Sequence, residues 1–429
     1  MSSSLVPELP TGPAEPATRT PTDWTTGAMN RRIRARYAAE RRFRALGLGA
    51  VVLSVAFLAF LLVTMLGQGL GGFTETRVNL PVDLRAARLT VTPAQLAGRG
   101  ADLALAGAGL EGAVDAAANR AFPQAGGATM LSDGAWLRVR DALKADPSLL
   151  ERPFALDVPV ATEIDTAYKS NGTPAAEATA AKLTLSRGLN RTFLTTADST
   201  DPTRVGVWGA LKGSLLTMAV TLALAFPIGV FAALYLEEYA PRNRWTDLIE
   251  VSINNLAAVP SIIFGLLGLA VFLGTMGLPR SAPLVGGLTL ALMTMPVIVI
   301  AGRNAIKGVP PSIRDAALGV GASPVQVVFH HVLPLALPGI LTGTIIGMAR
   351  ALGETAPLLM IGMRAFIAAP PGGLTSPATA LPVQIFLWSD EVNRGFVEKT
   401  SAAIVVLLAL LLAMNGVAIY LRNRFETRW

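Results

Sequence analysis

Long apolar stretches with little or no charge dominate the hydrophobic pattern of this 429-residue chain. About 20 mostly apolar residues in a helix cross the roughly 30 Å hydrocarbon core of a bilayer. Six stretches have that length: Leu46–Phe73, Gly213–Leu236, Asn255–Pro279, Ser281–Gly302, Val332–Met363 and Ser401–Leu421. The fifth of them contains two charged residues, Arg350 and Glu354. The pattern therefore predicts an all-α polytopic membrane protein with six transmembrane helices.

The residues before the first stretch have no apolar period. Residues 1–30 are rich in Pro, Thr, Ser and Ala, and seven arginines follow between Arg31 and Arg44. This composition predicts a disordered basic tail over residues 1–45 and a transmembrane helix over 46–73. The apolar run is too long for a secretory signal and lacks a clear small-residue cleavage site, so we expect an uncleaved span.

Residues 74–207, between the first and second spans, do not fit a bare helical bundle. They combine strand-like and Ala-rich helical segments, which predicts a mixed α/β periplasmic insert domain. The expected strands are Arg88–Val91 and Phe154–Val160, and the expected helices are Ala113–Phe122 and Pro174–Leu183. Three neighbouring carboxylates, Asp157, Glu163 and Asp165, are interpreted as scattered surface charges. The remaining residues, 208–429, then form the main transmembrane domain.

Composition narrows the class of protein further. Hydrophobic residues make up 52% of the chain and charged residues only 15%, against about 25% charged in soluble domains. The chain has no cysteine and two histidines, which excludes disulfides, thiol catalysis, iron–sulfur clusters and zinc-thiolate sites. We therefore expect no bound cofactor or metal in this chain.

The net charge of +7 is distributed unevenly. Basic residues accumulate in the N-terminal tail, after the second and fourth spans, and at the C-terminus; the loops on the opposite side are sparser in them. Because cytoplasmic loops carry the excess of Lys and Arg, both termini are predicted to lie in the cytoplasm. We expect the chain to contact the lipid bilayer and to bind no nucleic acid.

A predicted cytoplasmic loop, residues 303–336, carries the most informative motif. It contains Asp315-Ala316-Ala317, then Gly321, then His331-Val332-Leu333-Pro334. Ser312 is a candidate helix cap, and Gly321 and Pro324 are expected to end that helix. The pattern resembles the Glu-Ala-Ala…Gly…Ile-x-Leu-Pro loop of permease subunits of ATP-binding-cassette importers, with Asp315 and His331 as departures. The resemblance implies that Asp315, Ala316, Ala317, Gly321, Leu333 and Pro334 couple the chain to an ATPase.

Three ordered strings specify the resemblance. They are Leu234-Tyr-Leu-Glu-Glu-Tyr-Ala240, Pro260-Ser-Ile-Ile-Phe-Gly-Leu-Leu-Gly268 and Ala349-Arg-Ala-Leu-Gly-Glu-Thr-Ala-Pro357. Together they resemble the PstA permease family of the bacterial high-affinity phosphate importer, from about Leu211 to the C-terminus. The resemblance implies a MetI-like permease core in the last five spans and a transporter subunit that is not itself an enzyme. It also implies three partners: a second permease (PstC-like), an ATPase dimer (PstB-like) and a periplasmic phosphate-binding protein (PstS-like).

The chain has no G-x-x-x-x-G-K-[S/T] sequence, the loop that cradles nucleotide phosphates in P-loop ATPases. ATP and Mg²⁺ are therefore expected on the partner ATPase, and hydrolysis with them. This agrees with a docking role for the loop at 303–336.

Arg350 and Glu354 are the candidate substrate-pathway residues. Arg350 lies twelve residues after Pro338, about 18 Å along a helix, which places it near the middle of the bilayer. An ionisable residue at that depth costs roughly 2.5–3.5 kcal/mol and is functional by default. The i,i+4 spacing predicts that the two pair on one helix face, and a guanidinium suits phosphate oxygens; a purely structural ion pair is the alternative. Arg303, at the end of the fourth span, is a further pathway candidate or an ordinary membrane anchor.

Other functions remain open at this point. A permease for another oxyanion, such as sulfate, molybdate or thiosulfate, would carry the same coupling loop. A membrane-anchored periplasmic sensor or enzyme would not need five further spans. A channel or secondary transporter predicts inverted repeats or several intramembrane acids, and neither is evident in the sequence.

Overall fold

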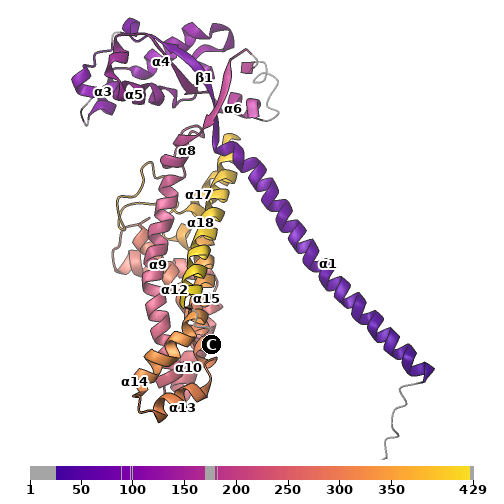
Figure 1. The fold of residues 1–429 in the computed structure, drawn as a ribbon. Coiled ribbons are helices and arrows are strands. Elements are labelled where there is room, and N and C mark those ends of the chain that lie inside the picture. Colours follow the sequence, from indigo (N-terminus) through magenta and orange to yellow (C-terminus); the bar gives the residue numbers. More distant parts are fainter. Residues whose placement is uncertain are drawn as a thin grey trace, which may run out of the picture. The chain divides into compact units, whose positions relative to one another are not determined.

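The computed structural model describes residues 26–87, 89–96, 98, 100–169, 179, 180 and 182–425 (Figure 1). The chain divides into two compact units, residues 1–63 and 64–429. The first described helix, α1 (Gly27–Gly72), crosses the boundary between them. Everything from β1 to α18 belongs to the second unit.

The prediction of a disordered tail is wrong for residues 27–45, which form the first turns of α1. The segment Arg31–Leu46 contains no glycine or proline and consists largely of Arg, Ala and Glu, which are good helix formers. Glu40 and Arg44 add an exposed i,i+4 ion pair. The Pro-rich part of the tail, residues 1–25, lies outside the described residues.

The insert is built on a small antiparallel sheet of three strands in the order β2-β1-β3. Its strands are β1 (Thr74–Val82), β2 (Phe154–Pro159) and β3 (Leu185–Leu189). Helices share the core of the sheet: α2 (Pro93–Leu96), α3 (Ala101–Gly107), α4 (Leu110–Ala121), α5 (Ala135–Ala145) and α6 (Thr162–Lys169). Fully buried Leu80, Leu110 and Val139 belong to this core. A further helix, α8 (Arg191–Thr195), packs instead with residues of the bundle.

The sequence identified part of this insert. The expected strand at 154–160 and helix at 113–122 correspond to β2 and α4, so the mixed α/β character is confirmed. The expected strand at Arg88–Val91 is wrong, because residues 89–92 lead without regular structure into α2 and both edges of β1 are already occupied by β2 and β3. The expected helix at Pro174–Leu183 lies mostly outside the described residues.

The rest of the chain is a helical bundle. Its main helices are α9 (Trp208–Leu234), α10 (Arg244–Ala257), α11 (Ser261–Gly268), α12 (Pro283–Lys307), α15 (Leu333–Gly353) and α18 (Gly395–Phe425). Shorter helices are α13 (Pro311–Gly319), α14 (Pro324–Gln326), α16 (Ala356–Met360) and α17 (Leu381–Ser389). Three π-helical segments extend them: η5 (Tyr235–Tyr239), η6 (Leu269–Thr275) and η7 (Val327–Val332).

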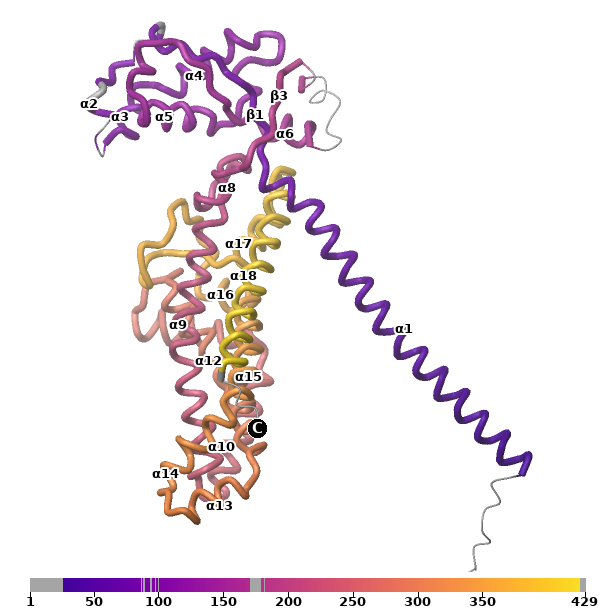
Figure 2. Tube along the Cα trace, viewed as in Figure 1, coloured from indigo at the N-terminus to yellow at the C-terminus, as the bar shows by residue number. Residues whose placement is uncertain are grey.

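Small residues let the central helices approach closely, as membrane helices commonly do. α12 lies between α9 and α15 (Figure 2). A Cβ on Gly287 or Gly302 of α12 would collide with α9, at Val220 and Ala233 respectively. A Cβ on Gly343 of α15 would collide with Ala301. These three helices therefore form one tightly packed layer.

Among the described residues, five helices are long and apolar enough to cross a membrane, or six if a bent pair counts as one span. The bent pair is α10 with α11–η6, at 100° to each other. A straight third span over 255–279 is therefore wrong: residues 255–257 still belong to α10, and Pro260 is extended and lacks the N–H that would continue the helix. The all-α polytopic class is confirmed, with a break in its third span.

Candidate functional site

The predicted coupling element folds as a helical hairpin at the end of the bundle distant from the insert (Figure 1). α13 starts with Pro311 at its first position, where a missing N–H costs nothing. The expected cap at Ser312 is wrong, since Pro310 holds the cap position and makes no side-chain hydrogen bond. Asp315 and Ala316 point to the surface, whereas Ala317 is buried against the bundle. Two residues of the Asp-Ala-Ala string are therefore accessible to a partner, and the third packs against the bundle.

Gly321 ends the first arm of this hairpin in a conformation that favours glycine. Its φ is +91°, and its N–H donates to the carbonyl of Leu318 at 2.9 Å. Ser323 then starts α14 with a capping box to Gln326, followed by Pro324 at the first helical position. The predicted turn at Gly321 is confirmed, and its cause is backbone geometry, because nothing lies within 4 Å of where a Cβ would be.

The tip of the hairpin presents apolar side chains to its surroundings. Val320, Val325 and Leu318 are 86%, 56% and 49% exposed. Further along, Leu333 is half-buried and Pro334 exposed at the start of α15. A partner that covers this tip would remove apolar surface from water, which favours association.

Two adjacent carboxylates in η5, the segment that extends α9, bind the surrounding arginines. Glu237 accepts from Arg303 Nε at 3.1 Å, and Glu238 accepts from Arg314 Nη2 at 2.6 Å. Arg303 also donates to Glu250 of α10 at 2.9 Å. Both glutamate side chains are largely covered by their partners.

This network changes the description of Arg303. Its side chain is 12% exposed, and its guanidinium bonds Glu237 through Nε and Glu250 through Nη2. Two carboxylates beside it compete with any arriving anion. Its assignment to the substrate pathway stays a prediction, and the geometry favours a structural tie between α9, α10 and α12.

Arg350 and Glu354 meet, but not on one continuous helix. α15 ends at Gly353 and Glu354 is extended, because Pro357 lacks the N–H that would bond Gly353 and its ring would clash there. The Nε of Arg350 lies 3.5 Å from Oε1 of Glu354, a long contact. Arg350 is 46% exposed on a face of α15 that this chain leaves open. The guanidinium is thus loosely held and accessible.

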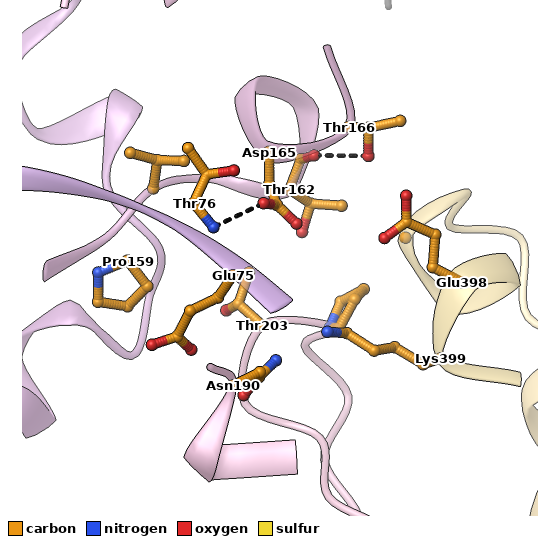
Figure 3. A pocket seen from close by; sticks show the side chains of 13 residues that line it. Glu75, Thr76, Pro159, Thr162, Asp165, Thr166, Asn190, Thr203, Glu398 and Lys399 are labelled. Atoms are coloured by element: carbon orange, nitrogen blue, oxygen red, sulfur yellow. Dashed lines mark hydrogen bonds between the residues drawn. The ribbon is translucent and has the colours of Figure 1, made fainter. Parts of the chain in front are cut away.

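A second ionic cluster, at the insert, was not expected from the sequence; Figure 3 shows its two carboxylates, Asp165 and Glu398. Lys169 of α6 donates from Nζ to the carbonyls of Gly71 and Thr74, at 2.9 and 2.8 Å. It also reaches the carboxylates of Asp165 and Glu398, at 2.6 and 3.3 Å. Asp165 is therefore not a free surface charge. These contacts attach the insert and the end of α1 to α18.

A small cavity lies beside this cluster. It has a volume of about 20 Å³ and is bordered by Glu75, Asn190 and Lys399 among others. Buried Lys399 donates to the carbonyl of Gly72 at 3.3 Å and lies over the ring of Phe193. This volume holds about one water molecule, so the cluster is suited to attachment and not to binding an oxyanion.

Sequence reasoning found the local motifs and missed these two ionic clusters. Arg314 is 76 residues from Glu238, and Lys169 is 229 residues from Glu398. A single sequence contains no signal for pairs at that separation. The only hint was the doubled glutamate at the end of an apolar span, where a charge is most often solvated.

Comparison with known proteins places the chain. Residues 225–427 match the family described as binding-protein-dependent transport system inner membrane component, and residues 30–178 match a domain of unknown function, DUF3333. The phosphate transport system permease protein PstA 1 of Mycobacterium tuberculosis is 36% identical over 36% of this chain and 51% of its own. The chain thus spans about half the length of the first relatives that it matches.

Other relatives are covered more fully. PstA of Yersinia pestis is 30% identical over 50% of this chain and 71% of its own length. PstA of Haemophilus influenzae is 31% identical over 48% and 73%. Among solved structures, the inward-facing MetNI methionine ABC transporter aligns with 52% of this chain and 98% of its own, with a TM-score of 0.40 and 19% identity. The chain therefore belongs to the PstA family of permeases, the inner membrane components of binding-protein-dependent transport systems.

Proposed function

We propose that this chain is the permease subunit of an ATP-driven importer that moves inorganic phosphate across the inner membrane. The observation that carries the proposal is its relation to phosphate permeases of which it covers 71–73% at 30–31% identity. Support comes from the exposed apolar tip of the coupling hairpin, which suits a docking partner, and from the accessible Arg350 on an otherwise apolar helix.

The division of labour follows from what the sequence lacks. Without a P-loop sequence, the chain leaves ATP and Mg²⁺ to a PstB-like ATPase dimer, which docks on Asp315, Ala316 and the apolar tip. A PstC-like second permease completes the pathway, and a PstS-like binding protein delivers phosphate from the periplasm. With both termini in the cytoplasm, the insert then lies in the periplasm.

Arg350 is the proposed phosphate contact. Its guanidinium can offer a bidentate fork to an oxyanion, and the 3.5 Å contact to Glu354 is weak enough to be exchanged for one. Glu354 would hold the arginine while the pathway is empty.

Reconstitution tests the proposal. The chain is assembled with the second permease and the ATPase in proteoliposomes, and the binding protein is supplied outside with radiolabelled phosphate. We expect uptake that requires ATP inside and the binding protein outside. Uptake of sulfate, molybdate or thiosulfate in preference to phosphate would assign the chain to another oxyanion. No ATP-dependent uptake of any of them would refute the importer.

A further inference from the structure

One arginine bonds α13 to the end of the bundle. Arg314, in the first turn of α13, donates from Nε and Nη2 to the carboxylate of Glu238, at 2.6–3.3 Å. Its Nη1 donates to the carbonyl of Val309 at 2.7 Å, and Nη2 also reaches the carbonyl of Ile306 at 3.1 Å. One guanidinium therefore joins α13 to the end of α9 and to the end of α12.

Apolar packing holds α13 mainly on η7, the other arm of the hairpin, because half-buried Ile313 and buried Ala317 share an apolar cluster with residues of η7. Ala317 is the one residue of α13 that is buried, and its methyl group is small. Leu318 points outward. By contrast, Arg314 and Glu238 are 23% and 11% exposed, so their ion pair is shielded from water and less screened than a surface pair. The arginine is thus the principal link between α13 and α9.

The receiving end of α9 is itself fixed. Glu237, next to Glu238, pairs with Arg303 and lies 3.7 Å from Lys307, both on α12. Arg303 in turn bonds Glu250 of α10. A displacement of α13 that pulls on Glu238 would therefore move α9, α10 and α12 together, because their ends are joined by charged hydrogen bonds.

We propose that Arg314 and Glu238 form a clamp that transmits movement of α13 to the transmembrane helices, with Arg314 as a positioning residue. The inference rests on the proposed function, since it presumes that an ATPase moves α13. It assigns the doubled glutamate of the Leu234–Ala240 string a role: Glu238 receives the coupling helix and Glu237 secures α12.

Size-preserving substitutions test the clamp in the reconstituted complex. Glu238→Gln and Arg314→Gln remove one charge each, and Arg314→Lys keeps the charge but loses the fork. The readout is oxyanion transported per ATP hydrolysed, normalised to assembled complex. We expect both glutamine variants to retain the ATPase and hydrolyse ATP, with the ratio at least tenfold lower. Arg314→Lys should be intermediate, and the double glutamine variant no worse than either single one. Exposed Arg242→Gln is the matched control and should keep the wild-type ratio.

The outcomes separate the clamp from the proposed function. Wild-type uptake with an unchanged ratio in both glutamine variants overturns the clamp alone. Loss of transport in proportion to loss of assembled complex also overturns it, because the pair would then only hold the fold together. If only the Arg314→Gln complex fails to assemble, the transport ratio of the Glu238→Gln complex tests the clamp: a lowered ratio supports it and a wild-type ratio overturns it. An inactive wild type would count against the importer, and the clamp would fall with it.

Discussion

Replacing Lys169 with methionine should loosen the insert from the transmembrane bundle. The ammonium has four acceptors within 3.3 Å, two carbonyls and two carboxylates, and its side chain is 5% exposed. Methionine fills a similar volume but donates no hydrogen bond. Asp165 and Glu398, at 16% and 21% side-chain exposure, would lose this cation.

The structure sets the size of the effect. Removing one partner of a buried ion pair costs about 3–5 kcal/mol. Residual exposure of the two carboxylates places the cost near the lower end, about 3 kcal/mol. Since each 1.4 kcal/mol is a factor of ten, the junction should open on the order of 100-fold more often.

Hydrogen exchange in the full chain measures this opening. The N–H of Thr76 donates to Asp165 at 2.8 Å, so exchange across residues 74–78 reports on the junction. Lys144→Met is the matched control: its pair with Asp102 is at the surface of the same insert and should contribute only about 0.2–1 kcal/mol. Equal exchange at 74–78 in both variants would refute the reasoning.

Four further results are expected. Gly321→Val should strain the left-handed turn by about 1–2 kcal/mol and reduce ATPase co-purification, whereas Gly321→Asn should be tolerated better; equal retention by both would argue against a backbone cause. Arg350→Gln should abolish phosphate uptake per assembled complex, with partial activity in Arg350→Lys; full uptake by Arg350→Gln would remove it from the pathway. A reporter active only in the periplasm should be active after exposed Glu151 and inactive at the C-terminus; the reverse would invert the topology. Burial raises the pKa of the Asp198 carboxyl, opposed by a hydrogen bond from Trp388. Because the native state then binds this proton more tightly than the unfolded state, stability should fall as pH rises from the usual Asp range through the raised pKa; Asp198→Asn should lack that loss in denaturation measured across acidic pH.

The spans could be predicted from the sequence, but their breaks could not. Helix length and apolar composition are local properties, and they identified the helices of the bundle. Proline alone did not mark the interruptions: Pro227, Pro296 and Pro338 lie inside unbroken helices. At Pro260 and Pro357 the helix ends instead. Neighbouring helices decide whether a freed carbonyl is tolerated, and a single sequence does not reveal those neighbours.

In the candidate site, too, local features could be predicted from the sequence and contacts between distant residues could not. The coupling hairpin was predicted from its resemblance to the Glu-Ala-Ala loop of importer permeases, because the matching residues, among them Asp315, Gly321 and Pro334, lie within 20 residues of one another. The pairing of Arg303 with Glu237 was not predicted, because charged residues at span ends commonly reach for the interface and the sequence suggested only a pathway residue or an anchor for Arg303. Their pairing depends on how α9, α10 and α12 pack, which only the fold determines.

The two ionic clusters hold opposite ends of the bundle. α9 follows directly on the insert at Trp208, with buried Val207 and Ala210 in the same apolar cluster as Phe193. It continues for 27 residues, about 40 Å as a helix, and η5 after it carries Glu238, which binds Arg314. Between these ends it packs on α12 where glycines leave no space to slide freely. Ion pairs therefore lie where the bundle contacts α13 and the insert, whereas small apolar residues lie where the helices of the bundle contact each other. The ion pairs attach α13 and the insert to the bundle. Because the glycine contacts hold α9 closely against α12, we expect these two helices to move together when either attachment shifts.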